Sequence, residues 1–267
     1  MAAQHTLANA GSDVDLPVVR RIGVADLRAA LVAGYADFAA RPTHIVFLGL
    51  IYPLIGLVLT RLVFGYDILP LLFPLAAGFV LIGPLAALGL YELSRRREAG
   101  LDVRLRHAFD VLRSPSIGAI AALAGLLLVI FFVWIAAADA IYVAAFGHAP
   151  AASMSGFLSQ VFQTSEGVML IILGNGIGFL FALLVLVLTV VSFPLLLDRQ
   201  VSPAVAILTS VRAVVANPGP MALWGLIVAG LLVLGSIPLF LGLAIVVPVL
   251  GHATWHLYRR VVEPVAH

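Results

Sequence analysis

The sequence predicts an all-α, polytopic membrane protein with six transmembrane helices, arranged as three hairpins that each follow a cytoplasmic amphipathic helix. A mean hydropathy of +1.14 with 10% charged residues lies outside the range of soluble globular domains. Six apolar segments are each about 20 residues long, the length that a helix needs to cross ~30 Å of hydrocarbon. Fourteen of the fifteen arginines then fall on one side of the membrane, in a chain without lysine.

The last two of the six predicted spans follow one another so closely that their apolar run is almost continuous. A single helix over 221–257 would be about 55 Å long, which is too long for one crossing. The sequence "GSIP" at 235–238 supplies a break between the last two spans. The predicted spans are 44–64, 68–91, 116–138, 167–193, 221–237 and 239–257.

The distribution of arginine predicts the orientation of these spans. The loop at 139–166 contains no arginine, and Arg61 alone falls on the same side as that loop. All other arginines lie in the N-terminal segment, the second and fourth loops and the C-terminus. Cytoplasmic loops carry the excess of positive charge, so both termini are expected in the cytoplasm.

Three segments of similar plan precede the hairpins and suggest a threefold internal repeat. The segments 24–42, 101–115 and 202–218 each have an amphipathic pattern that ends in a polar residue and proline. The competing interpretation is that any six-span bundle needs helical corners and prolines at such positions. The predicted organisation is a disordered cytoplasmic tail at 1–21, a membrane domain at 22–262 and a short tail at 263–267.

The segment 101–113 is predicted to lie flat on the cytoplasmic face of the membrane. An α-helical period places Leu105, Ala108, Phe109 and Leu112 on one stripe, and Gly100 and Asp102 suit the end of one helix and the cap of the next. The alternative is that "SRRREAG" continues the second span as a straight rod. Basic residues expected at the interface are Arg95, Arg96, Arg97, Arg104, Arg106 and Arg113.

Two further carboxylates near the ends of predicted spans are expected to pair with nearby arginines. Glu92 precedes the run of three arginines, and Asp198 precedes Arg199. We expect these pairs to be exposed, to contribute about 0–1 kcal/mol each, and to fix helix register.

Few polar residues in the spans are candidates for a site. Asn175 lies deep in a span beside Gly174 and Gly178, whose GxxxG spacing favours helix packing over a hydrogen-bonding site for a substrate. His252 and His256 are four residues apart and could share a metal, but an interfacial position beside aromatic residues explains them as well.

The sequence assigns no catalytic residue, no cofactor-binding residue and no metal site. It has no cysteine and lacks the GxSxG, HExxH and Walker motifs. We therefore expect no enzyme and no cofactor. Membrane lipids and other membrane proteins are the expected partners, and nucleic acid is not.

Three sequence blocks resemble a bacterial family of predicted integral membrane proteins, the domain of unknown function number 2189. They are "GPLAALGLYELSRRREAG" at 83–100, "TSVRAVVANPGPMALWGLIVA" at 209–229 and "GHATWHLYRR" at 251–260. The resemblance implies a multi-pass protein of the bacterial inner membrane and no activity. We expect a non-enzymatic structural or accessory membrane factor. The alternative is a small-solute permease with a cavity between the three hairpins.

Overall fold

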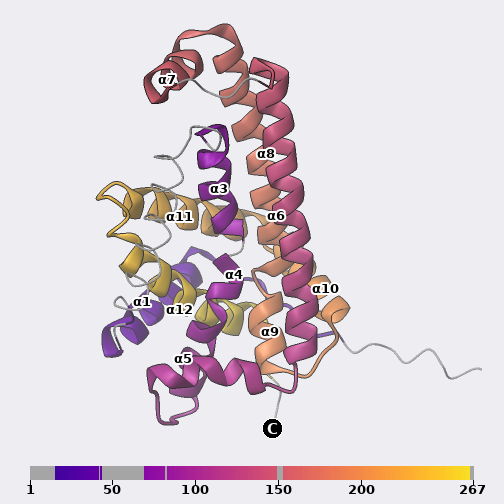
Figure 1. Ribbon diagram of the computed structural model, residues 1–267. Helices are drawn as coiled ribbons and strands as arrows, with labels where there is room; N and C mark the ends of the chain where they lie inside the picture. The colour runs from indigo at the N-terminus through magenta and orange to yellow at the C-terminus, as the bar shows by residue number, and fades with distance from the viewer. Residues whose placement is uncertain (1–15, 42, 44–68, 82, 149–152, 265–267) are drawn as a thin grey trace, which may run out of the picture.

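The computed structural model describes residues 16–41, 43, 69–81, 83–148 and 153–264, and this part of the chain is all-helical (Figure 1). Its single β-bridge joins Val19 to Val262. The first predicted span, 44–64, lies outside the described residues. An all-helical membrane fold is therefore confirmed, whereas six spans in three hairpins stay a prediction.

Three helices of the described residues are long and apolar enough to cross a membrane. They are α6 (Ile117–Phe146), the combined Ser165–Asp198 and α11 (Pro218–Ser236). The second comprises α8 (Ser165–Thr189) and α9 (Ser192–Asp198). The break between α8 and α9 is explained by Pro194, which cannot donate to the carbonyl four residues earlier and clashes with it.

The outward surfaces of these helices are apolar. Phe132 on α6, Phe179 on α8 and Leu226 on α11 are each more than 60% exposed. Soluble monomers rarely expose contiguous apolar surface of this extent. These surfaces therefore require lipid around them.

The predicted second span, 68–91, is divided in the structure. It comprises α3 (Leu69–Leu81), α4 (Gly83–Ala86) and the start of α5 (Leu88–Glu98). Pro84 lies in α4, where a continuous helix would need its missing N–H. Because α5 continues to Glu98, the arginines of "SRRRE" are helical. The helix then stops at Gly100, whose φ of 68° suits glycine, as predicted.

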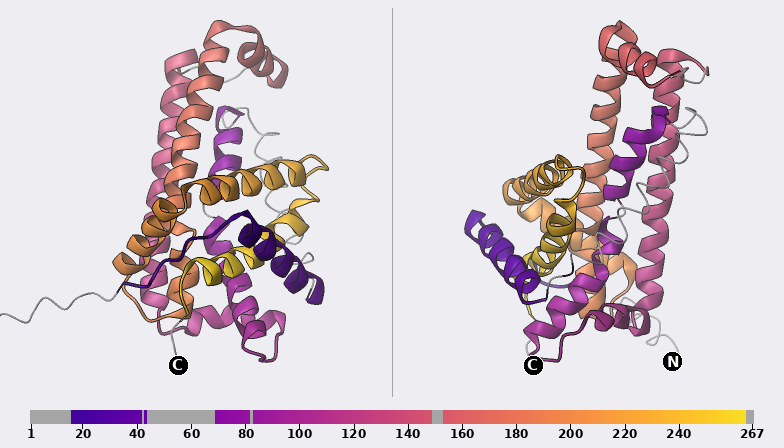
Figure 2. Two further views of the ribbon diagram at one scale, coloured as in Figure 1. Left: turned by 180° about the vertical axis from the view of Figure 1, so that it is seen from behind. Right: turned by 60° about the vertical axis from the view of Figure 1, so that its left-hand side comes forward.

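The apolar helices α6 and α8 stand side by side along one side of the molecule (Figure 1). Helices α6 and α8 run together, with α3 beside them (Figures 1 and 2). Helix α7 (Met154–Gln163) lies at one end of this pair, and α5 and η1 (Leu105–Arg113) lie at the other. Helix α10 (Pro203–Ala216) packs on α8 and α9. Helix α11 runs crosswise to the pair, and α12 (Leu243–Val261) lies to one side of it, packed on α1 (Val24–Ala40), α5 and α11.

Helix α12 (Leu243–Val261) is enclosed by protein. It packs against α1 (Val24–Ala40) and α5. A Cβ atom at Gly34 would lie 2.5 Å from the Ala253 backbone nitrogen, and one at Gly251 would lie 2.4 Å from Leu90 Cδ1. The backbones of α1 and α12 thus approach closely at Gly34, and the Leu90 side chain packs onto Gly251. The sixth predicted span, 239–257, corresponds to this helix, which is not among the three apolar helices above.

The segment η1 (Leu105–Arg113) is a 3₁₀-helix, so the predicted α-helix over 101–113 is wrong in type and in its first residues. Side chains three apart are eclipsed in a 3₁₀-helix. Ala108 and Val111 therefore face the protein, while Phe109 and Leu112 are 70% and 68% exposed. The predicted cap, Asp102, forms an ion pair with Arg104 at 2.8 Å, and Arg104 occupies the N-cap position.

Residues near both termini are paired with each other. The Arg20 N–H donates to the Val261 carbonyl at 2.7 Å, and the Glu263 N–H donates to the Val18 carbonyl at 3.0 Å. The Asn217 side chain, at the start of α11, accepts from the Ile22 N–H and donates to the Arg20 carbonyl. Residues 16–21 of the predicted tail are thus held by hydrogen bonds to the membrane domain.

Candidate functional site

A buried aspartate of α1 is the centre of a polar network between α1, α5 and α12. The buried stripe of α1 consists of Leu27, Ala30, Gly34, Asp37 and Phe38. This helical spacing turns Asp37 toward the protein, where it is only 8% exposed. A buried carboxylate needs hydrogen bonds and opposite charge, and the neighbouring helices supply both.

Three groups hydrogen-bond or ion-pair with the Asp37 carboxylate, and a fourth joins the network through one of them. Ser94 of α5 donates its hydroxyl to Oδ2 at 2.6 Å, and His256 Nε2 lies 2.8 Å from the same oxygen. Arg97 approaches Oδ1 at 3.1 Å. His252 joins the network through Ser94, because its Nδ1 lies 2.8 Å from the Ser94 oxygen.

These contacts determine the tautomer of His252. The only hydroxyl proton of Ser94 is directed to Asp37, so the Ser94 oxygen is left as an acceptor. His252 Nδ1 must therefore carry the hydrogen, and Nε2 carries the lone pair. His252 is 2% exposed, and its Nε2 has no hydrogen-bond partner among the described residues.

The residue types Ser, His and Asp also form hydrolase triads, but the order here differs. In a triad the histidine bonds both the serine and the aspartate, and the serine faces the substrate. Here the serine lies between His252 and Asp37 and is only 1% exposed. Ser94 therefore positions His252 and Asp37 and is not presented as a nucleophile.

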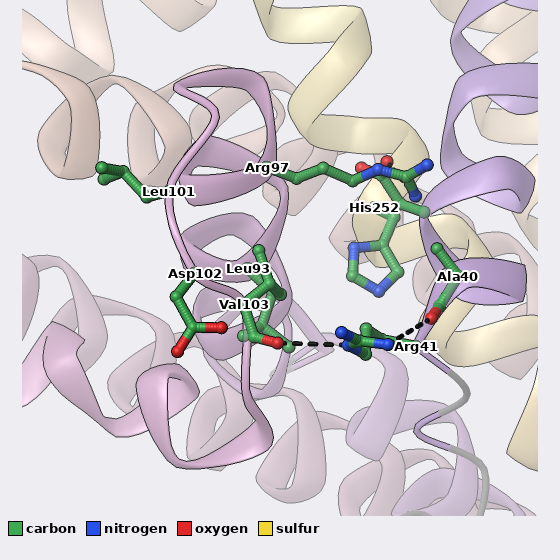
Figure 3. Close-up of a pocket in the computed structure, with 9 residues that line it drawn as sticks. Ala40, Arg41, Leu93, Arg97, Leu101, Asp102, Val103 and His252 are labelled. Carbon is green, nitrogen blue, oxygen red and sulfur yellow. Dashed lines mark hydrogen bonds and ion pairs between the residues drawn. The ribbon is translucent and has the colours of Figure 1, made fainter.

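The network borders a hollow of about 310 Å³ at the end of the molecule that holds α5 and η1. Figure 3 shows the His252 ring pointing into this hollow, which Arg97 and Arg41 also border. Arg41 donates to the Val103 and Ala40 carbonyls at 3.2 and 3.3 Å. Within the described part of the chain, no carboxylate forms an ion pair with Arg41, so these contacts leave its charge uncompensated.

The environment of Asp37 favours its ionised form. Burial alone raises the pKa of Asp37, but the hydrogen bonds from His256 and Ser94 outweigh burial and bring the pKa below its ordinary value. The network therefore holds a carboxylate at neutral pH.

The six predicted interfacial arginines divide into two groups. Arg95, Arg96, Arg97 and Arg104 each form an ion pair with a carboxylate of the protein. Arg106 and Arg113 are exposed on η1, and no partner for them is found among the described residues. Of these six arginines, Arg106 and Arg113 alone combine exposure with a charge that is unpaired among the described residues.

The predicted pairing of Glu92 and Asp198 with arginines is confirmed. Glu92 binds Arg95 at 2.7 and 2.9 Å, and Asp198 lies 3.3 Å from Arg259 and 3.8 Å from Arg199. The expected exposure was wrong for Glu92, whose side chain is only 2% exposed between residues of α5, η1 and α9. Losing its partner would therefore leave a buried charge.

Of the two glycines in the GxxxG pattern, one lies at a helix contact and the other does not. A Cβ atom at Gly178 would lie 3.0 Å from Trp134 of α6, so this glycine sits at a helix contact. Gly174 faces open space within the described structure. The exposed Asn175 donates to the Ile171 carbonyl of its own helix at 2.8 Å.

His252 and His256 share one face of α12 as their spacing predicts. Both histidines reach Asp37, His256 directly and His252 through Ser94. In the described ranges, no group of three or more His, Cys, Asp or Glu side chains is suited to a metal ion.

Sequence reasoning missed Asp37 and Ser94. The signal for Asp37 is an acid on an otherwise apolar stripe of an amphipathic helix, at helical spacing from Ala30 and Gly34. The signal for Ser94 is weaker, because a serine among leucines and arginines has no distinguishing spacing. A third missed residue is Glu98, which accepts from Trp255 Nε1 and Arg259 Nε.

Comparison with known families supports the assignment to the membrane. Residues 72–198 match the model of a family described as "Predicted integral membrane protein (DUF2189)". The predicted resemblance is confirmed for this segment, just under half of the chain, which holds α6, α8 and α9. Of the three sequence blocks, 83–100 lies within the match. No significant match was found among curated proteins or solved structures.

Proposed function

We propose that this integral membrane protein is a non-enzymatic structural or accessory factor of the bacterial inner membrane that binds anionic lipid at its cytoplasmic face. The observation that carries the proposal is the outward ridge of η1, defined by Arg106, Phe109 and Leu112. Phe109 and Leu112 are more than two-thirds exposed, and Arg106 and the adjacent Arg113 have no partner in the described structure.

The composition of this ridge suits the boundary between headgroups and acyl chains. Exposed aromatic and aliphatic side chains enter the acyl region, while arginines contact phosphates at roughly 1 kcal/mol each near an anionic surface. Helix α6 begins at Ile117, directly after η1, with its exposed apolar surface. The ridge is therefore at the depth where a headgroup layer would begin.

The polar groups of the candidate site also favour a role without catalysis. Asp37, Ser94 and His256 are bonded to one another or to neighbouring residues. The permease alternative needs a polar path through the apolar middle of the bundle. The hollow beside His252 is instead lined by the end of α1, by the loop before η1, and by residues of α5 and α12.

Spin labels on single cysteines test the proposal, because the chain has no cysteine of its own. Labels at 109 and 112 should lie deeper in reconstituted bilayers than labels at 108 and 111, with the three-residue period of η1. Replacing Arg106 and Arg113 with glutamine should make the depth at 109 less dependent on anionic lipid. Uniform water exposure from 105 to 113 would contradict the proposal.

The permease alternative is tested separately. Proteoliposomes that contain the chain should show the same solute flux as protein-free vesicles over a panel of small sugars, amino acids and ions. Selective, saturable uptake of any one of these solutes would favour the permease.

A further inference from the structure

We propose that the hollow between α1, α5 and α12 is a binding site for a phosphate monoester group in its singly charged form. Such a group carries anionic oxygens and one P–O–H on the same phosphorus. The hollow presents the matching chemistry, namely guanidinium donors and one buried lone pair. The observations that lead to this ligand are the tautomer of His252, the charge of Arg41 and the size of the hollow.

Among the residues that the structure describes, no donor reaches the acceptor His252 Nε2. Its ring is 2% exposed and is fixed by the Ser94 contact at Nδ1, so Nε2 cannot turn away from the hollow without breaking that bond. A buried acceptor without a partner costs free energy unless a ligand supplies a hydrogen. The ligand must therefore carry an O–H or N–H.

Arg41 supplies positive charge at the same hollow. Its Nε and one terminal nitrogen bond backbone carbonyls, which orient the guanidinium without neutralising it. The two aspartates that line the hollow are both paired, Asp37 with Arg97 and Asp102 with Arg104. With both aspartates paired, the charge of Arg41 is the one left over at the hollow, which favours a ligand with one negative charge.

The two requirements together select the ligand class. Sulfate and phosphodiesters are anions without an ionisable O–H at neutral pH, and so they leave Nε2 unpartnered. A monoanionic phosphate monoester satisfies both the guanidiniums and Nε2. The volume of about 310 Å³ accommodates the group, and both free phosphate and a lipid headgroup such as phosphatidic acid present this chemistry.

This site is separate from the outward ridge of η1, because none of the ridge residues lines the hollow. The function proposed above can fail while this site binds, and the reverse also holds.

Calorimetric titration of the detergent-solubilised full chain at pH 6 tests the proposal with inorganic phosphate and with sulfate at equal ionic strength. We expect phosphate to bind at least about tenfold more tightly than sulfate, because sulfate would leave the buried acceptor Nε2 without a hydrogen bond. Arg41→Gln should weaken both anions. Arg28→Gln, an exposed arginine on the same helix that does not line the hollow, is the matched control and should change neither.

His252→Asn should remove the preference for phosphate while leaving weak anion binding. A melting curve shows whether this variant is folded, and Arg41→Gln keeps the test decisive if it is not. A second arm uses short-chain phosphatidic acid and short-chain phosphatidylmethanol, a phosphodiester anion whose headgroup has no O–H, in the same detergent. Binding of inorganic phosphate indicates that the group alone suffices, whereas Arg41-dependent binding of phosphatidic acid only assigns the site to a lipid headgroup.

Equal affinity for phosphate and sulfate, together with equal affinity for the two lipids, would overturn the proposal. An equal loss in Arg28→Gln and Arg41→Gln would also overturn it, because that result indicates non-specific attraction. Absence of binding in both arms would do the same.

Discussion

Glu92 shows how burial changes the value of an ion pair at the scale of single residues. We expect Arg95→Gln to lower the free energy of unfolding by about 1–3 kcal/mol, because it removes the two hydrogen bonds to an enclosed carboxylate. Arg106→Gln, an exposed arginine without a described partner, should change it by less than about 0.5 kcal/mol. Thermal unfolding in one detergent compares the two, and equal effects would contradict the assigned burial.

Asp37 gives the network a defined dependence on pH. Its pKa is below the ordinary value of 3.8, so the carboxylate contributes stability that is fully present above that value and is lost as pH falls below it. Asp37→Asn should therefore be less stable than the parent at pH 6, and the difference should shrink from pH 4 to pH 3. Unfolding midpoints across this range measure the effect, and a difference that stays constant with pH would contradict it.

The network also shows what could be predicted at this scale. The four-residue spacing of His252 and His256 was enough to place them on one face. Their partners could not be found this way, because Ser94 and Asp37 lie on other helices, 158 residues from His252 and 219 residues from His256 respectively. Local periodicity gives the direction of a side chain, whereas its partner depends on how helices pack.

At the scale of elements, the close approach of α1 and α12 depends on a glycine. Gly34→Ala would place a Cβ atom 2.5 Å from the Ala253 nitrogen, so the helices must separate at a cost of about 1–3 kcal/mol. Gly118→Ala on α6 meets no atom within 4 Å and should be neutral or slightly stabilising. Unfolding of both variants in detergent tests the contact, and a neutral Gly34→Ala would show that α1 and α12 do not pack in this way.

The helices were predictable to different degrees for physical reasons. Helices α6 and α8 have long apolar sequences, so their positions in the chain can be predicted from hydropathy alone. The 3₁₀ form of η1 could not be predicted from the sequence, because over nine residues the same amphipathic pattern is compatible with an α-helical or a 3₁₀ period. The packing of Ala108 against Gly89 of α5 is a tertiary contact that the pattern does not contain.

At the scale of the whole molecule, the ends of the α6–α8 pair differ in charge. Helix α7 and its flanking residues 147–164 contain no arginine, whereas α5, η1 and the segment between them, at the opposite end, contain six (Figure 1). Because positive charge is retained in the cytoplasm, we expect α7 outside the cell and α5 inside it. The separation of these two ends by the length of α6 makes the expectation measurable.

A membrane-impermeant maleimide provides that measurement, since every introduced cysteine is the only one in the chain. Ser155→Cys, at an exposed position of α7, should react in cells whose outer membrane has been made permeable while the inner membrane is intact. Ala99→Cys, exposed at the end of α5, should react only after the inner membrane is permeabilised, which also serves as the control for its reactivity. Labelling of position 99 in intact cells would show that the orientation is opposite to the one predicted. Labelling of both positions only after permeabilisation would show that α6 does not cross the membrane. The first result would place Phe109, Leu112 and Arg106 at the outer leaflet, so the proposed attraction to cytoplasmic anionic lipid would lose its basis.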